Sequence, residues 1–184
     1  IMSGDQIYTD DVAGPMLKAI HSVIKVLGFP PEEMPGLSSR EVHEERPSFY
    51  QRQTLLPQSK QSDSIINILF KGARKPVFTS GNAQNHLITL AEVLSMYLLV
   101  WSPTLWQVIG KDWKVLPESL EQQFHPRWQA ESLCIEQFTQ QLEAVARGLA
   151  HVPVAMIFDD HDVTDDWNLS ADWEQTAYSN PLSK

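Results

Sequence analysis

Aspartates gather at two places in this sequence, and each group follows directly on a short apolar run. The first group lies in residues 4–11 (GDQIYTDD) and the second in residues 158–166 (FDDHDVTDD). Five of the eight residues from 159 to 166 are aspartates. Like charges at this density repel one another, so solvent or a bound cation must offset them.

The residue types in both groups suit the binding of a hard metal ion. Asp5 and Asp160 offer carboxylate ligands, and His161 adds an imidazole that can donate a proton. Gly4 lets the chain turn sharply after the first apolar run, and Tyr8 follows three residues after Asp5. The alternative interpretation is a pair of solvated acidic turns with His161 at the surface.

Both acidic groups stand where a strand is expected to end. Residues 1–3 are apolar and are predicted to be the last part of a buried strand, and residues 152–158 a second buried strand. In α/β sheets, ligands bind at the carboxyl ends of the strands, because side chains converge on a crevice there. The position of the two groups therefore favours a site over two unrelated turns.

The elements between the two groups are predicted to be mostly helical. The sequence predicts helices over about residues 14–27, 87–101, 128–149 and 171–178. The second of these is apolar on nearly every face, which indicates a buried helix. Asn82 or Ser80 is expected to cap its start, and Ser170 the start of the last helix.

Two further stretches lack a clear helical period. Residues 28–64 are rich in Pro, Ser, Glu and Arg and are predicted to form a long loop, with room for a short helical turn. Residues 64–70 are apolar and fit a strand or a helix equally well. The order of elements is therefore strand, large helical insert, strand.

The composition excludes several classes of protein. The chain has 184 residues, enough for one domain, and a net charge of −9 from 14 Lys and Arg against 23 Asp and Glu. That balance argues against binding to the phosphate backbone of nucleic acids. No apolar stretch is long enough to span a membrane. The single cysteine, Cys134, excludes an internal disulfide and a cysteine-based zinc cluster, and it is predicted to be buried.

Four stretches together resemble one protein family. These are GDQIYTDDVAGPML and MIFDDHDVTDDWNL, with NHLITLAEV and MYLLVWSP between them. In order and approximate separation they look like the alkaline phosphatase D (PhoD-like) branch of the metallophosphoesterases. The resemblance implies that residues 1–184 are part of one α/β metallophosphoesterase domain, mostly helical in this segment, with a helical insert at roughly 11–151 between two parallel strands.

The resemblance also implies roles for five residues. Asp5 would bridge two metal ions, Tyr8 would ligate iron, and Asp160 would be a further metal ligand. His161 would protonate or stabilise the leaving oxygen, and Asp162 would orient His161. The implied metals are divalent or trivalent ions such as Fe, Mn or Ca, two or more in the intact protein. The implied reaction is hydrolysis of a phosphomonoester or phosphodiester by a metal-activated water.

A bridging Asp5 sets a geometric expectation. Two metal ions about 4 Å apart require the carboxylates of Asp5 and Asp160 to lie within about 8 Å of each other. The strands that precede them should therefore be parallel neighbours, since only then do both carboxyl ends reach the same edge of the sheet. The family's earlier and later motifs are not found in this sequence, so this segment alone is expected to hold an incomplete metal site and little activity.

Other polar residues receive weaker assignments. Asp159, Asp165 and Asp166 are expected to support the site or to be solvated, and His86 to be a core or cap residue. The cations that might reach a substrate phosphate are interpreted as surface residues: Arg46, Arg52 and Arg74. The alternative function is a non-catalytic interaction module. In that reading, the helices around residues 87–149 bind a partner or self-associate, and the acidic loops are only structural.

Overall fold

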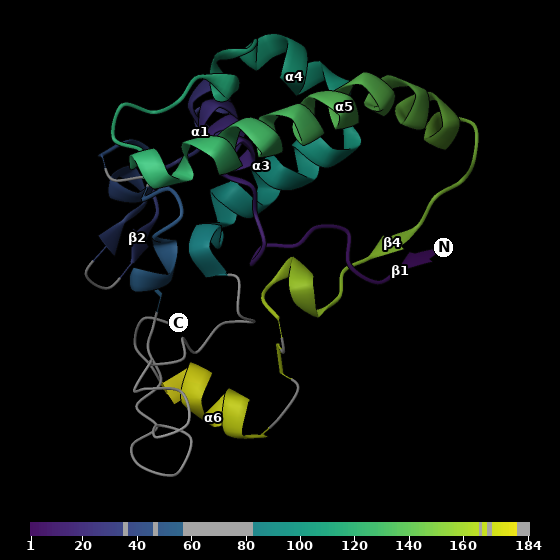
Figure 1. Cartoon of the computed structure of the whole chain (residues 1–184). Coiled ribbons are helices and arrows are strands. Elements are labelled where there is room, and N and C mark those ends of the chain that lie inside the picture. Colours follow the sequence, from purple (N-terminus) through teal and green to yellow (C-terminus); the bar gives the residue numbers. More distant parts are fainter. Residues whose placement is uncertain (35–36, 46–47, 57–82, 166, 169–170, 180–184) are drawn as a thin grey trace.

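The computed structural model describes residues 1–34, 37–45, 48–56, 83–165, 167–168 and 171–179. This part of the chain is mostly helical, with two small sheets (Figure 1). The helices are α1 (Gly14–Leu27), α3 (Leu90–Trp101), α4 (Pro103–Ile109), α5 (His125–Ala150) and α6 (Ala171–Ser179). The strands are β1 (Met2–Ser3), β2 (Glu33–Met34), β3 (Leu37–Ser38) and β4 (Met156–Ile157).

Helix α1 forms the centre of the core and has the bounds that the sequence predicted. Pro15 occupies the first turn, and Gly28 ends the helix in the left-handed conformation at φ 66°. Its N–H donates to the Ile24 carbonyl at 2.9 Å. The buried side of the helix carries Met16, Leu17, Ala19, Ile20, Val23 and Ile24. These side chains pack against α3, α4 and α5.

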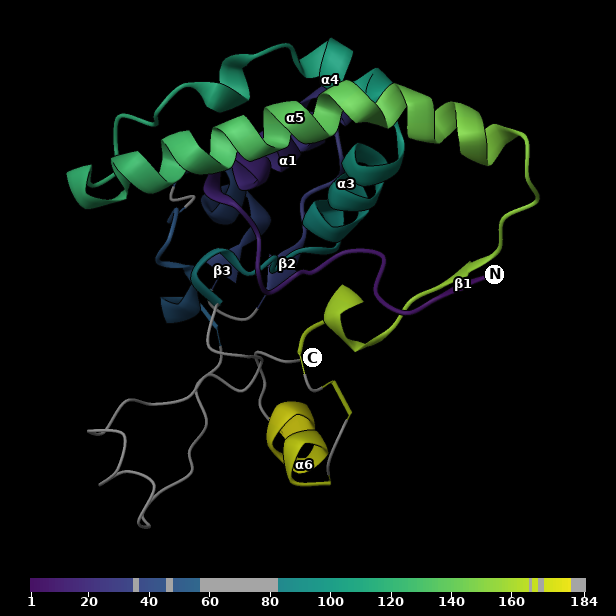
Figure 2. The same cartoon turned by 45° about the vertical axis from the view of Figure 1, so that its right-hand side comes forward.

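Helix α5 runs across α1 and α3, with α4 above it (Figures 1 and 2). Its Trp128, Ile135 and Leu142 are buried at seven-residue spacing, which is the stripe that the sequence predicted. Trp128 meets the ring of Phe49 edge to face, with the ring centroids 5.4 Å apart. Cys134 lies at the surface of this helix, so the prediction that it is buried is wrong.

Helix α3 begins three residues later than predicted, because Thr89 is its cap. The Thr89 side chain accepts a hydrogen bond from the Glu92 N–H, and the Glu92 side chain accepts one from the Thr89 N–H, which forms a capping box. The prediction of a buried helix is correct for one side of α3 and wrong for the other. Leu90, Leu94 and Leu98 are 63%, 42% and 40% exposed, because no described residue covers that side.

Helix α4 and the β2–β3 hairpin are structure that the sequence did not reveal. Helix α4 follows α3 after one residue: Ser102 caps it and Pro103 occupies its first turn. In the predicted loop 28–64, β2 and β3 form an antiparallel hairpin. The predicted helical turn in this loop is present, as a π-helical turn at Glu41–Glu45 and a 3₁₀ turn at Arg52–Thr54.

The two strands on either side of the helical insert are parallel neighbours, as expected. Met2 pairs with Met156 and Ser3 with Ile157, and the strands lie together beside the helices (Figure 1). The prediction that they are buried is wrong, since Met156 and Ile157 are 42% and 58% exposed. Among the described residues, only these two strands form the sheet.

Some predictions fall outside the described residues. These are the 64–70 segment, the cap Ser170, and the residues Arg46, Arg74 and Asp166. The prediction that Asn82 or Ser80 caps the start of α3 is wrong, because Thr89 is the cap. The last helix is present as α6, near the predicted range. Among the described helices, none is both long and apolar enough to cross a bilayer.

Candidate metal centre

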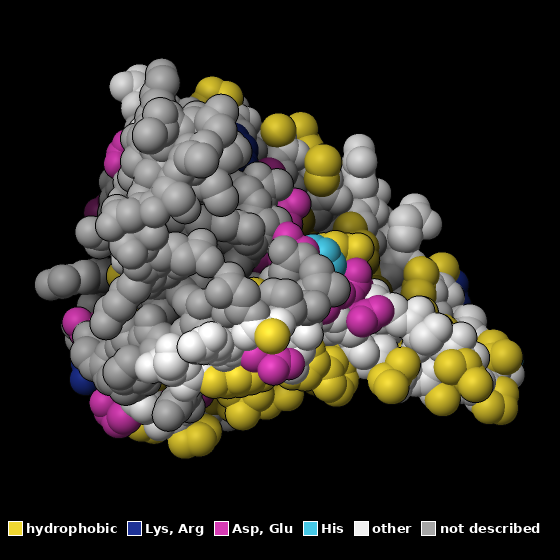
Figure 3. All heavy atoms as spheres, turned by 90° about the horizontal axis from the view of Figure 1, so that it is seen from below, with side chains coloured by type: hydrophobic (Ala, Val, Ile, Leu, Met, Phe, Trp, Pro, Cys, Tyr) yellow, Lys and Arg dark blue, Asp and Glu magenta, His cyan; other side chains and the backbone are white. Residues whose placement is uncertain are grey.

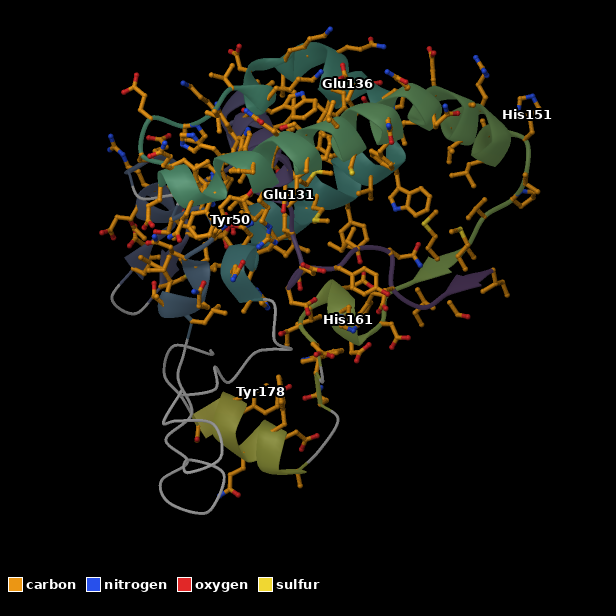
Figure 4. All side chains as sticks on the ribbon, in the orientation of Figure 1. Tyr50, Glu131, Glu136, His151, His161 and Tyr178 are labelled. Carbon is orange, nitrogen blue, oxygen red and sulfur yellow. The ribbon has the colours of Figure 1, made fainter. Side chains whose placement is uncertain are left out.

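The loops that leave β1 and β4 bring three potential metal ligands together. One ligand atom from each of Asp5, Asp160 and His161 lies within 4.8 Å of the other two. The expected approach of the Asp5 and Asp160 carboxylates is therefore confirmed. Seen from below, acidic side chains gather around a histidine at the surface (Figure 3). His161 itself lies on the turn after β4, between α5 above and α6 below in the view of Figure 4.

Hydrogen bonds also join the loop after β1 to the loop after β4. The Thr9 N–H donates to the His161 carbonyl at 2.9 Å. The Thr9 hydroxyl lies 3.0 Å from the His161 carbonyl and 2.8 Å from that of Val163. Thr9 is 1% exposed, so these bonds are shielded from water. They hold the backbone of His161 beside the loop that carries Asp5.

Asp5 has the feature expected of a ligand that awaits a cation. Gly4 precedes it at φ 119°, a conformation that side chains rarely adopt, and turns the chain off β1. The Asp5 Oδ1 atom is buried and accepts no hydrogen bond from the described residues. A buried carboxylate oxygen without a donor is costly. A hard cation at this oxygen would remove that cost, so the residues present fit a metal ion.

His161 is oriented by Asp10. The His161 Nδ1 atom lies 3.0 Å from Asp10 Oδ1, and Nε2 lies 3.4 Å from Asp165 Oδ1. Asp10 is 1% exposed, and an ionised carboxylate only accepts, so Nδ1 carries the proton. Partial burial lowers the pKa of His161, but the hydrogen bond and charge of Asp10 outweigh it. Together with the charges of Asp165 and Asp5, these effects of Asp10 raise the pKa of His161 above its usual value.

Tyr8 lies at the rim of the group. Hydrogen bonding to Asp5 and the charge of Asp5 raise the pKa of Tyr8 above its usual value. The Tyr8 ring is tilted against the His161 ring, with the centroids 4.7 Å apart. Tyr8 is 49% exposed, so its hydroxyl can turn toward an ion at Asp5. A cation there would oppose the carboxylates and favour the phenolate.

Asp162 does not face His161, which corrects the role implied for it. It is 2% exposed, and its carboxylate accepts hydrogen bonds from the N–H groups of Gln6 and Asp159 at 3.1 and 3.0 Å. Asp162 ends a 3₁₀ turn whose cap is Asp159, and the two form a capping box. This turn points the Asp162 side chain inward, away from the ring that Asp10 holds.

His86 contacts the loop after β4, whereas His21, Arg52 and Glu92 form a separate group. His86 is 4% exposed, and its Nε2 atom lies 3.0 Å from the Thr164 hydroxyl, so the prediction of a core residue is confirmed. Arg52 was predicted to be a surface residue. This prediction is wrong, because the side chain is fully buried. Its guanidinium donates to Glu92 at 2.8 and 3.1 Å. The Glu92 carboxylate also lies 2.7 Å from His21 Nε2.

Sequence reasoning missed Asp10 and Thr9 as parts of the site. Asp10 had a signal, because it is one of three acids in the first group, but Asp11 beside it looked equivalent. Asp10 is buried and Asp11 exposed, and only the fold separates them. Thr9 carried no signal at all.

Comparison of the chain with protein-family models, with curated proteins and with solved structures found no match in any of the three. What the chain does is therefore inferred from its own residues and their geometry.

Proposed function

We propose that this chain supplies two metal-binding loops of a metal-dependent phosphohydrolase of the PhoD-like type. The substrate would be a phosphomonoester or a phosphodiester. The observation that carries this proposal is the convergence of Asp5, Asp160 and His161 at the carboxyl ends of adjacent parallel strands. Residues 155 positions apart in the sequence meet there, and one carboxylate oxygen among them is buried without a donor.

Three residues of this chain would hold the metal ions. Asp5, Tyr8 and Asp160 offer oxygen ligands, the type that Fe, Mn and Ca accept. Bound ions would supply a water of lowered pKa and offset the charge of the phosphoryl group. Hard cations take about six ligands each, so three residues do not complete two sites. Further ligands would have to come from water, substrate or other protein groups.

His161 would act on the leaving group. Because Asp10 fixes the proton on Nδ1, Nε2 is the nitrogen from which a second proton can pass to the departing oxygen. The nearby charges of Asp10 and Asp165 favour the protonated ring. Asp10 also limits the rotation of the ring, as the third member of a catalytic triad does.

Mn²⁺ binding to the 184-residue chain tests the proposed centre. The amount of free Mn²⁺ is followed by its electron paramagnetic resonance signal as protein is added. We expect weak binding, which Asp5→Asn and Asp160→Asn abolish. Asp11→Asn is the matched control, since it removes the same charge from an exposed neighbour. Equal binding by all four proteins would mean that the acids act only as a diffuse negative surface.

Hydrolysis of bis-(p-nitrophenyl) phosphate by the intact protein tests the reaction. We expect turnover that a chelator abolishes and that Mn²⁺ or Fe²⁺ restores. Turnover that survives exhaustive chelation would contradict a metal-dependent reaction.

One observation favours the second candidate function, a helical interaction module. Leu90, Leu94 and Leu98 form an exposed row along α3, at the spacing of one helical face. A module of this kind needs the row but has no need of Asp5, Asp160 and His161. Mn²⁺ binding that depends on those acids therefore separates the two functions.

A further inference from the structure

The Asp162 carboxylate joins three separate parts of the chain. It accepts from the Gln6 N–H at 3.2 and 3.1 Å and from the Ile7 N–H at 3.2 Å, both in the loop after β1. It accepts from the Asp159 N–H at 3.0 Å, in the loop after β4. The fourth donor is the Tyr97 hydroxyl, which makes a short hydrogen bond from α3.

These donors stand directly beside the candidate metal ligands. Gln6 follows Asp5 in the chain, and Asp159 precedes Asp160. The Asp162 carboxylate therefore lies between the two loops and is bonded to the neighbour of each ligand. It is 2% exposed, so water does not replace these donors, and hydrogen bonds to a buried charge are strong.

Tyr97 links this arrangement to the helices. It lies on α3, and its hydroxyl is the one donor to Asp162 among the described residues that comes from outside the two loops. Burial raises the pKa of Tyr97, and the hydrogen bond and charge of Asp162 raise it further. The phenol therefore stays protonated and keeps donating.

We propose that Asp162 and Tyr97 are positioning residues, which hold Asp5 and Asp160 at the spacing of a shared metal centre and fix that centre to α3. The proposal rests on the function proposed above, but Asp162 acts through the loop backbones and not through His161. Groups that orient metal ligands in this way typically change metal affinity by about 10- to 100-fold when removed.

Amide hydrogen exchange of the metal-free chain tests whether Asp162 holds the loops. In Asp162→Asn an NH₂ group replaces one acceptor oxygen, so the amides of Gln6, Ile7 and Asp159 are expected to exchange faster than in the wild type. Asp11→Asn, which removes a nearby exposed charge, should leave all three unchanged. Unchanged exchange in Asp162→Asn would overturn the proposal.

The affinity for Mn²⁺ tests whether the contacts of Asp162 and Tyr97 position the metal ligands Asp5 and Asp160. Tyr97→Phe removes a single hydroxyl, and we expect it to weaken Mn²⁺ binding by about 10-fold or more and to quicken exchange at Gln6 and Ile7. Tyr178→Phe is the control, because the Tyr178 hydroxyl donates to Asn168 at an exposed position. A Tyr97→Phe protein that is folded and binds Mn²⁺ like the wild type would show that Tyr97 only stabilises the fold.

The two arms separate failure of this proposal from failure of the proposed function. If the wild-type chain binds no Mn²⁺, these residues do not form a metal centre in this chain alone. The exchange rates in Asp162→Asn and Tyr97→Phe then still decide whether the two residues hold the loops together.

Discussion

The two ring nitrogens of His161 have different surroundings, which makes its proposed role testable. Nδ1 is hydrogen-bonded to the buried Asp10, while Nε2 lies 3.4 Å from a second acid, Asp165. His161→Ala in the intact protein is expected to lower turnover by about 10²- to 10⁴-fold, the usual contribution of a proton donor. The metal content should stay near that of the wild type.

Two measurements separate this role from metal binding. Turnover is measured with an aryl phosphate ester, and metal content by elemental analysis of the dialysed protein. Asp10→Asn keeps an acceptor oxygen and loses the charge, so it should lower turnover by less. Loss of the metal in His161→Ala with Asp160 intact would mean that His161 is a ligand and not the donor.

The buried ring of His86 predicts how stability depends on pH. Burial lowers the pKa of His86 below its usual value, although the hydrogen bond to the Leu87 carbonyl opposes this. In the unfolded chain the ring binds a proton near pH 6.5, whereas the folded chain excludes it. The free energy of unfolding should therefore fall as pH drops below about 6.5, by at most about 1.4 kcal/mol per pH unit for one ring.

Urea unfolding at pH 7.5 and pH 5.5 measures this effect. His21 and His43 also have lowered pKa values through burial and add to the fall, while His161, with its raised pKa, opposes it. His86→Gln should be less stable at pH 7.5 and show a smaller fall toward pH 5.5. If the free energy of unfolding of His86→Gln falls as much as that of the wild type, groups other than His86 cause the pH dependence. His151→Gln, at an exposed ring, is the control.

At the scale of residues, the sequence predicts ligands better than it predicts their partners. Asp5, Asp160 and His161 follow apolar runs, and their position alone places them at strand ends. The partner of His161 depends on which of two adjacent aspartates faces inward, and the fold selects Asp10. Arg52 and Glu92 are 40 positions apart, so their buried ion pair has no local signal.

At the scale of elements, the start of α1 predicts an exception to a common rule. Replacing a glycine in a helix by alanine usually stabilises the protein, but at Gly14 it should destabilise it. A Cβ atom added at Gly14 would lie 2.5 Å from the Tyr50 hydroxyl and 3.0 Å from Trp128 Cε3. Tyr50 cannot move easily, because its hydroxyl donates to Glu131 at 2.6 Å, and the Gly14 N–H donates to the same oxygen at 2.8 Å. Figure 4 shows Tyr50 and Glu131 close together below α5.

Gly14→Ala is therefore expected to destabilise the chain by about 1–3 kcal/mol, as overpacking of a core does. Gly148→Ala is the matched control, because α5 leaves open space around that position. There the better helix propensity of alanine should stabilise the chain by about 0.5–1 kcal/mol. Denaturant unfolding of both variants gives the comparison, and a stabilising Gly14→Ala would contradict the packing described at the start of α1.

The elements that were predicted well are those whose signals are local. Pro15 and Gly28 mark both ends of α1 within the segment itself. The start of α3 was misplaced because the sequence offers several capping residues, and Thr89 is selected by its reciprocal bond with Glu92. Helix α4 was not predicted, although Pro103 fits the first turn of a helix.

At the scale of the whole molecule, the apolar character of β1 and β4 was predicted correctly but their burial was not. Burial depends on what lies over a sheet, and no residue of the strand itself specifies that cover. Parallel sheets are normally covered on both faces, and a sheet of two strands is marginal by itself. Here Ile1, Ile157 and Phe158 are 101%, 58% and 54% exposed.

This exposure predicts that the isolated chain self-associates through its β1–β4 sheet. Unpaired strand edges and apolar faces both favour association with another copy. The apparent mass measured by light scattering should therefore rise with concentration across a dilution series. Ile157→Lys places a charge on the exposed sheet and should keep the chain monomeric over the same series.

Val108→Lys is the control for this effect of charge. Val108 is 56% exposed, close to the 58% of Ile157, but Val108 lies on α4. A lysine there adds the same charge to the molecule, which carries a net charge of −9, without touching the sheet. Association should persist in Val108→Lys. If both variants become monomeric, the sheet is not the specific contact. If association is abolished only by changing the row of leucines on α3, the helices form the interface.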